Sequence, residues 1–232
     1  MSTLDPTDWS SLRALGHQML DDMMDHLASI RTQPVWQKMP EDVRQGFTAP
    51  LPTTGTPPEA LYERFQADIQ PYVTGNLHPR FMGWVHGGGN PVSMLAELLA
   101  GAMNANCGGR DHVGIAVERQ VIAWAAQMLG MPAGTSGVLL TGSSMANFCA
   151  LLCARQKALG EAGHETGVSF SKLVAYASAG VHRCVTGAMD MAGLGRAALR
   201  KIPLDAQMRM DMAALRAAIA ADKAAGLTPF PV

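Results

Sequence analysis

Strand and helix patterns alternate along the C-terminal part of the chain, and this alternation limits the fold more than any other feature. Short apolar runs are each followed by a longer stretch in which apolar residues recur every three or four positions, as in amphipathic helices. The alternation predicts an α/β fold with a mostly parallel sheet. The predicted strands are 137–141, 173–177, 200–204 and one that begins near Pro229, and the predicted helices are 144–159, 181–194 and 211–225.

The N-terminal part of the chain shows no such alternation of strand and helix patterns. Apolar residues spaced by three or four predict a helix from Thr7 to Arg31, with Thr7 as its N-cap. A Pro- and Thr-rich stretch and a second helix over 58–69 follow. These pieces cannot enclose a core alone, so we predict that residues 1–75 form a helical arm that lies on the main body or on a second subunit.

The remaining residues, 76–232, are expected to form the first part of a larger domain. Two further helices are predicted over 93–105 and 115–129, ahead of the alternating region. The sequence ends on "GLTPFPV", at the entry to a strand. We therefore expect the sheet to be incomplete in this chain, with its remaining strands on a longer version of the chain or on a second chain.

Composition and charge exclude several classes of protein. A chain of 232 residues with 48% hydrophobic and 16% charged residues is compact and ordered. A net charge of −1 gives no attraction to nucleic acid or to an acidic membrane surface. We find no membrane span and no secretory signal, so a cytoplasmic location is expected. The four cysteines lack disulfide-framework and zinc-ribbon spacings, and no metal site is predicted.

The stretch "TGSSMAN" marks the point where a predicted strand gives way to a helix. Gly142, Ser143 and Ser144 would there present unpaired backbone N–H groups, two hydroxyls and the positive end of a helix dipole. This combination is typical of a phosphate site. The motif is neither a P-loop nor a nucleophile elbow. A plain helix start with capping serines is the alternative interpretation.

His182 follows the next predicted strand, within "LVAYASAGVHRCV". Helix starts that follow parallel strands lie on one edge of a sheet, where ligands collect. A flat imidazole beside a phosphate site favours pyridoxal phosphate (PLP) over a nucleotide. The alternative is that His182 is simply a helix cap or a surface residue.

Five blocks of the sequence, taken in order and spacing, carry a resemblance to a known family. They are "NLHPRFMGWVHGGGNPVSMLAELLAGAMNAN", "VERQVIAWAAQMLGMP", "GVLLTGSSMANFCALLCAR", "LVAYASAGVHRCV" and "MRMDMAALRAAIAADKAAGLTPFPV". The chain resembles the N-terminal half of the group II PLP-dependent amino acid decarboxylases, the aromatic-L-amino-acid decarboxylase family. The resemblance covers nearly the whole chain and is loosest in the Pro-rich stretch.

The resemblance implies a fold type I PLP enzyme with helices on both faces of its sheet. It also implies a homodimer in which the N-terminal helices clasp the partner. By position, Gly142, Ser143 and Ser144 would bind the cofactor phosphate, and His182 would stack on the pyridine ring as a catalytic residue. The stretch that contains Trp84, Val85, His86 and Gly87 would form the wall of the substrate pocket. This chain has Gly87 where the animal enzymes use a hydroxyl, and its glycine run is one residue shorter.

The implied reaction is the decarboxylation of a small L-amino acid, with aromatic substrates favoured, to its amine and CO2. The family's Schiff-base lysine lies beyond the matched region, and none of the five lysines here stands in its His-Lys setting. We therefore predict that this chain is a carboxy-lyase only when completed and is inactive alone. Two alternatives remain open: other fold type I chemistry such as transamination or aldehyde formation, and a non-catalytic truncated fragment.

Overall fold

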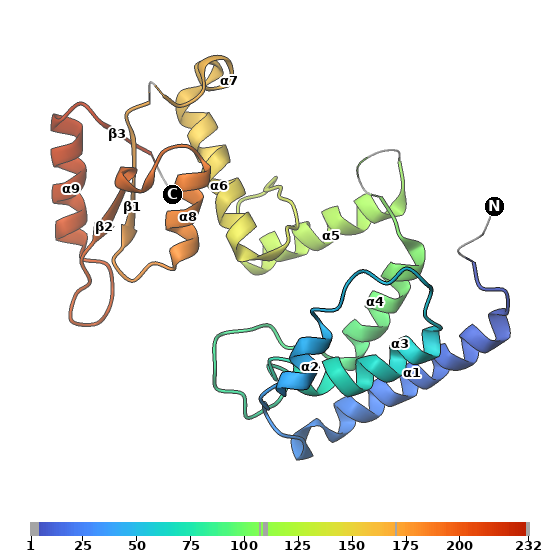
Figure 1. The fold of residues 1–232 in the computed structure, drawn as a ribbon. Helices are drawn as coiled ribbons and strands as arrows, with labels where there is room; N and C mark the ends of the chain where they lie inside the picture. Colours follow the sequence, from blue (N-terminus) through green and yellow to red (C-terminus); the bar gives the residue numbers. More distant parts are fainter. Residues whose placement is uncertain (1–4, 107, 109–110, 170, 231–232) are drawn as a thin grey trace. The chain divides into compact units, whose positions relative to one another are not determined.

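The computed structural model describes residues 5–106, 108, 111–169 and 171–230 (Figure 1). The chain divides into two compact units, residues 1–106 and residues 107–232. This division falls after the predicted arm of residues 1–75 and leaves the role of that arm untested. The arm therefore stays a prediction.

The first unit is helical and begins with a long amphipathic helix. Asp8 caps this helix, because its carboxylate accepts a hydrogen bond of 2.9 Å from the backbone N–H of Ser10. The predicted cap, Thr7, is therefore wrong by one residue. The helices of the unit are α1 (Trp9–Ser29), η1 (Ile30–Thr32), α2 (Glu41–Gly46), α3 (Pro58–Arg64), the π-helical turn η2 (Phe65–Ile69), η3 (Gln70–Tyr72) and α4 (Pro91–Met103).

A buried tyrosine joins α1 to α3. The Tyr62 hydroxyl donates a hydrogen bond of 2.7 Å to the carboxylate of Asp22, and the Gln66 side chain donates another of 3.0 Å to the same oxygen. Burial, reinforced by the Asp22 charge, raises the pKa of Tyr62 to about 12. The helices over 7–31 and 58–69 are confirmed in position, and this polar cluster fixes how they pack.

The second unit contains the sheet. Its elements are α5 (Val113–Met128), α6 (Gly142–Leu159), α7 (Glu161–Thr166), β1 (Leu173–Ser178), α8 (Arg183–Met191), η4 (Arg196–Ala198), β2 (Leu199–Ile202), α9 (Met212–Ala224) and β3 (Thr228–Pro229). The strands are parallel and lie in the order β2-β1-β3. Asp211 caps α9 as predicted, because its side chain accepts from two backbone N–H groups of the first turn.

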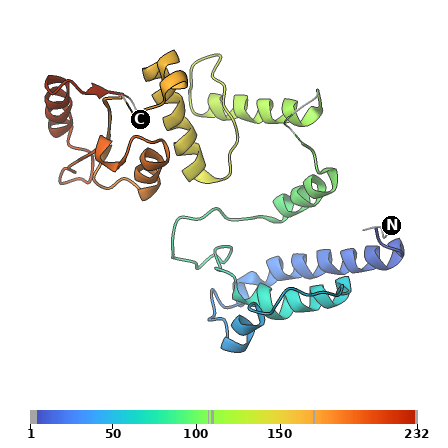
Figure 2. The same cartoon turned by 45° about the horizontal axis from the view of Figure 1, so that its top comes forward.

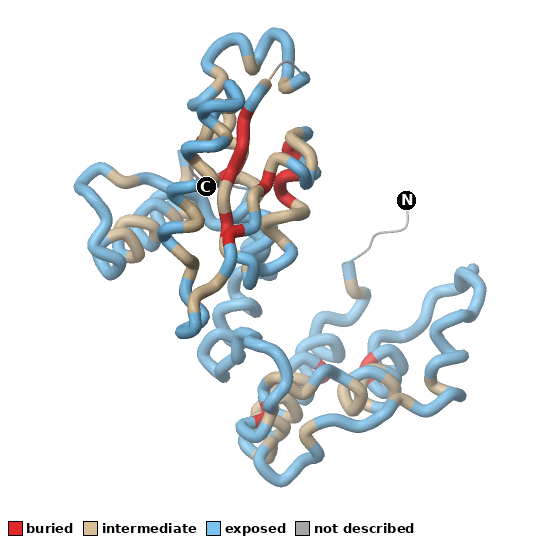
Figure 3. The backbone as a smooth tube through the Cα atoms, turned by 90° about the vertical axis from the view of Figure 1, so that its left-hand side faces the viewer, coloured by how far each residue is buried: buried red, intermediate tan, exposed pale blue. Residues whose placement is uncertain are grey.

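Helices cover both faces of this sheet, as Figures 1 and 2 show. Alternate residues of β1 point to opposite faces. Leu173, Ala175 and Ala177 enter the core with α6 and α8, whereas the Tyr176 hydroxyl reaches Asp222 on α9. The buried positions of the unit gather in β1 and α8 (Figure 3). The predicted α/β fold with a parallel sheet is confirmed.

The predicted strand over 137–141 is wrong. This segment is irregular, and Val138 and Leu139 are each more than half exposed. Its backbone is instead fastened to α5, since the N–H of Leu139 donates to the carboxylate of Glu118 at 3.1 Å. An apolar run becomes a strand only where another strand pairs with it, and no described strand lies beside this one.

Two helices are apolar without being buried. No residue of α4 or α5 is buried, and Leu98, Leu99 and Trp124 are each more than half exposed. Exposed apolar surface of this extent is uncommon in a folded monomer. In the described part of the chain, no helix has the length and apolar character needed to cross a membrane.

Candidate functional site

The start of α6 is open to an oxyanion. Gly142 has φ of +80°, a conformation that glycine adopts without strain, and a Cβ at this position would meet no atom within 4 Å. Thr141 is the N-cap residue, but its side chain makes no capping hydrogen bond in the described structure. The first N–H groups of a helix have no partner within the helix. They are therefore available here to a bound anion.

Ser143 and Ser144 lie in this first turn, and both are exposed. Their position adds two hydroxyl donors to the backbone N–H groups of the turn. A phosphate ester needs several donors and a positive field, and a helix start supplies both. The residues present therefore fit the phosphate group of the cofactor expected from the sequence.

His182 lies at the start of α8, where it is the N-cap residue. Its Nδ1 atom accepts a hydrogen bond of 3.2 Å from the backbone N–H of Cys184. In this arrangement Nδ1 carries no proton, so the neutral ring keeps its proton on Nε2. The cap holds the ring at the helix start, and the side chain is exposed. A flat ring held in this way can lie against a second flat ring.

Asn147 links the two helix starts. Its Nδ2 atom lies 2.8 Å from the carbonyl oxygen of Ser143 and 3.6 Å from the sulfur of Cys184. Helices α6 and α8 also pack closely along their apolar sides. The structure thus brings Ser143, Ser144 and His182 into one part of the second unit. Asn147 is not among the residues predicted for the site; its unfavourable helix propensity was the available signal.

The remaining predicted residues lie in the first unit, on the loop before α4. The rings of Phe81, Trp84 and His86 form a cluster, with centroid separations of 5.6 Å between Trp84 and His86 and 5.9 Å between Phe81 and His86. Both pairs are stacked, at 22° and 20°. These distances are typical of favourable aromatic pairs. Val85 is fully exposed and points away from any packing.

Gly87 follows this ring cluster. Its carbonyl oxygen accepts a hydrogen bond of 3.1 Å from the Asn76 side chain, which fixes the end of the loop. A Cβ at Gly87 would meet no atom within 4 Å, so the position has room for a larger side chain. Asn90 then caps α4 through its side chain. The described loop offers a backbone surface at Gly87 and a flat surface at Trp84.

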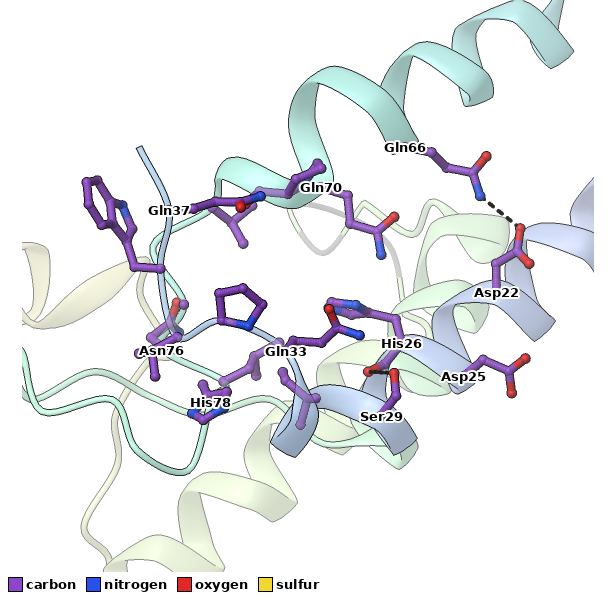
Figure 4. A pocket seen from close by; sticks show the side chains of 18 residues that line it. Asp22, Asp25, His26, Ser29, Gln33, Gln37, Gln66, Gln70, Asn76 and His78 are labelled. Atoms are coloured by element: carbon purple, nitrogen blue, oxygen red, sulfur yellow. Dashed lines mark hydrogen bonds between the residues drawn. The ribbon is translucent and has the colours of Figure 1, made fainter. Parts of the chain in front are cut away.

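A cavity of about 750 Å³ lies elsewhere in the first unit. Its lining comes from residues between Asp22 and His78, and Figure 4 shows the amide side chains of Gln33, Gln37 and Gln70 among them. His78 is buried, and its Nε2 atom has no hydrogen-bond partner in the described structure. None of the predicted site residues lines this cavity. Within the described ranges, no three His, Cys, Asp or Glu side chains gather as metal ligands.

Comparison with known proteins gives a consistent result. The pyridoxal-dependent decarboxylase conserved domain matches residues 40–232. The aromatic-L-amino-acid decarboxylase of Bacillus atrophaeus is 29% identical over 229 residues, which are 95% of this chain and 45% of that protein. The Sus scrofa enzyme of the same name is 33% identical over 244 residues, covering 95% of this chain and 48% of its own length.

A solved structure agrees with these matches. The crystal structure of Catharanthus roseus tryptophan decarboxylase in complex with L-tryptophan superimposes with a TM-score of 0.82 at 26% identity. The match covers 98% of this chain and 51% of that one. The chain thus spans about half the length of the relatives it matches.

Proposed function

The chain belongs to the family of pyridoxal-dependent decarboxylases, and from this we propose that it takes part in the decarboxylation of an L-amino acid to its amine and CO2. Its fold is that of the fold type I PLP enzymes, and the cofactor of the family is pyridoxal phosphate. The observation that carries the proposal is the open, glycine-led start of α6, tied to the start of α8 through Asn147. This chain would supply the part of the site that binds the phosphate and the ring.

We assign the cofactor phosphate to the first turn of α6. The backbone N–H groups of Gly142, Ser143 and Ser144 would donate to its oxygens, together with the two serine hydroxyls. Hydrogen bonds to a charged acceptor are about twice as strong as neutral ones. The open space above Gly142 supports this assignment, because the phosphate can approach the backbone closely there.

We assign the face of the cofactor ring to His182. When bound, pyridoxal phosphate withdraws the electron pair that departure of CO2 leaves on the α-carbon. His182 would stack on one face of the ring and hold the ring in one orientation beside the substrate. The cap on Nδ1 supports this role, since it holds the imidazole in one orientation and leaves the proton on Nε2. Orientation of this kind lowers a barrier by several kcal/mol in general.

An aromatic amino acid is the substrate class that the loop favours. Trp84 and His86 form a stacked pair with an exposed surface, and a flat side chain would extend the stack. The backbone at Gly87 would lie beside the substrate. The named functions of the relatives, aromatic-L-amino-acid and tryptophan decarboxylation, support the same class.

The proposal extends to the assembly. The exposed apolar surfaces of α4 and α5 would be covered in a homodimer or by the rest of the protein, and the helical arm would clasp the partner. The lysine that binds the cofactor covalently would come from the half of the relatives' length that this chain does not span. A cytoplasmic location, and inactivity of this chain alone, remain predictions.

The experiment is a product assay on the whole protein loaded with PLP. L-Tryptophan, L-tyrosine, L-phenylalanine and L-glutamate are supplied separately, and CO2, amine, aldehyde and keto acid are each quantified. The proposal expects CO2 and amine in equal amounts, fastest with an aromatic substrate. Formation of aldehyde or keto acid as the main product would replace decarboxylation by another reaction, and a preference for glutamate would reject the substrate class.

A further inference from the structure

Asn147 occupies an unusual position for an amide side chain. It lies in the second turn of α6, where asparagine is a poorer helix former than alanine, and it is exposed. Its side chain therefore buries little surface in the core. What it does contribute is two contacts, to the carbonyl oxygen of Ser143 and to the sulfur of Cys184. A side-chain amide has two N–H donors, which is the number these two contacts require.

The second contact continues to His182. The sulfur of Cys184 accepts a hydrogen bond from the Asn147 side-chain amide, and the backbone N–H of Cys184 donates to His182 Nδ1. An unbroken series of contacts thus runs from the carbonyl of Ser143, through Asn147 and Cys184, to the imidazole. The series joins the turn assigned to the phosphate with the ring assigned to the pyridine. The apolar packing of α6 on α8, through Leu151 and Met189, is separate from it.

This series of contacts would affect catalysis if the phosphate binds at the first turn of α6 and the cofactor ring at His182. The phosphate and the pyridine ring belong to one rigid molecule, so the two groups that bind them must keep a fixed separation. A displacement of about 1 Å can cost roughly a hundredfold in rate. The core of α6 and α8 holds the helices together, but exposed first turns can still shift. A polar contact between those turns would restrict the shift.

We propose that Asn147 is a positioning residue, which sets His182 against the cofactor ring by tying the first turns of α6 and α8 together through Cys184. The proposal rests on the function proposed above. Asn147 touches neither phosphate nor substrate in this scheme. Its effect passes through Cys184 to the imidazole.

The test is a double-mutant cycle in the whole PLP-loaded protein, with Asn147→Ala, Cys184→Ala and the double variant. Three quantities are measured: kcat, the PLP dissociation constant from cofactor absorbance, and the circular dichroism of the bound cofactor. We expect each single variant to lower kcat about tenfold and to weaken the cofactor dichroism. The double variant should be no worse than either single one, because both remove the same contact. Cys184→Ser, which keeps an acceptor, should retain most of the activity.

Gln156→Ala is the matched control, since Gln156 lies near the far end of α6 and donates its amide to the carbonyl oxygen of Gly160, the residue that follows the helix, at 2.7 Å. It should leave kcat and the dichroism unchanged. Melting temperatures of the PLP-free proteins should agree within about 3 °C, which excludes a merely structural effect. Additive losses in the cycle, or an unchanged dichroism in Asn147→Ala, would overturn the proposal. If Ser143→Ala/Ser144→Ala and His182→Ala also leave PLP binding and turnover unchanged, the proposed function itself fails.

Discussion

The hydroxyl of Tyr176 donates a hydrogen bond of 2.8 Å to the carboxylate of Asp222 and so joins the central strand β1 to α9. Arg200, paired with Tyr176 across the β1–β2 register, donates to the same carboxylate at 2.9 Å. Arg200 first and Tyr176 second hold the pKa of Asp222 below its usual value. Burial, and then Asp222, raise the pKa of Tyr176 to about 12. The packing of α9 on the sheet therefore depends on whether the carboxylate of Asp222 is charged.

The first prediction concerns the pH dependence of stability. Because the pKa of Asp222 is lowered in the folded state, its contribution to stability is present above the ordinary carboxyl pKa of 3.8 and is lost as the pH falls through the folded pKa. Because the folded pKa of Tyr176 is raised, its contribution is present below 10.0 and is lost as the pH rises toward 12. The free energy of unfolding, measured with urea across the pH range, should fall at both the acid and the alkaline end.

Two variants separate the loss of stability at low pH, the acid limb, from the loss at high pH, the alkaline limb. Asp222→Asn should flatten the acid limb in part, since Asp8 and Asp205 also have lowered pKa values. Tyr176→Phe should flatten the alkaline limb in part and cost about 1 kcal/mol at neutral pH. Tyr62→Phe should flatten the same limb in part, because the pKa of Tyr62 is also raised to about 12. An alkaline limb that both variants leave untouched would contradict the assignment.

The second prediction concerns the first turn of α6. Replacing Ser143 and Ser144 together by alanine should raise the PLP dissociation constant at least tenfold, because each lost bond to a charged acceptor costs about 1.5 kcal/mol or more. Cofactor absorbance during equilibrium dialysis measures the constant. Ser10→Ala, at the start of α1, removes a comparable serine hydroxyl and should change nothing. An unchanged constant in the double variant would reject the phosphate site.

The third prediction concerns His182. His182→Ala should lower kcat about a hundredfold while most of the PLP stays bound, since the phosphate remains anchored and only orientation is lost. His182→Phe keeps a flat ring but lacks the Nδ1 acceptor, so an intermediate kcat is expected. Turnover and cofactor absorbance are read on the same samples. His164→Ala, on the exposed surface of α7, serves as control. Loss of cofactor without loss of turnover per bound PLP would assign His182 to binding alone.

Much of this fold could be predicted because its periodic segments are unambiguous. The helices over 58–69 and 211–225 and the strand over 173–177 follow from apolar spacing, and the structure has them in those places. The run over 137–141 has the composition of a strand, but its backbone is hydrogen-bonded to the Glu118 side chain of α5 instead of to another strand. Sequence spacing cannot tell whether a partner strand is present, and pairing decides the outcome.

The helix start proposed for the phosphate was predictable to a similar extent. Glycine and serines after an apolar run indicate an open helix start, and α6 does begin at Gly142. The contact between Asn147 and Cys184 joins positions that are far apart in the sequence, and no local pattern encodes it. Only the packing of α6 against α8 brings these two side chains together.

The fourth prediction concerns the ring cluster. Trp84→Ala should raise KM for an aromatic amino acid about 2- to 10-fold, which is the value of one or two aromatic pairs. KM for L-glutamate should not change, because the glutamate side chain has no ring that could stack on Trp84. Met82→Ala is the control, since Met82 lies in the same loop and is 95% exposed. Equal effects on both substrates would show that Trp84 supports the loop rather than the substrate.

The last prediction compares two glycines of the first unit. Gly75 has φ of +78°, and a Cβ there would lie 1.7 Å from the backbone oxygen of Val35. Because the clash is with backbone, no side-chain rotation relieves it, and Gly75→Ala should lower the free energy of unfolding by more than about 2 kcal/mol. Gly16 lies inside α1, where a Cβ would meet no atom within 4 Å. Gly16→Ala should therefore raise the free energy of unfolding by roughly 0.5–1 kcal/mol, through helix propensity alone. Urea unfolding of both variants measures the difference, and equal effects of either sign would mean that the approach of Gly75 to Val35 is not part of the folded protein.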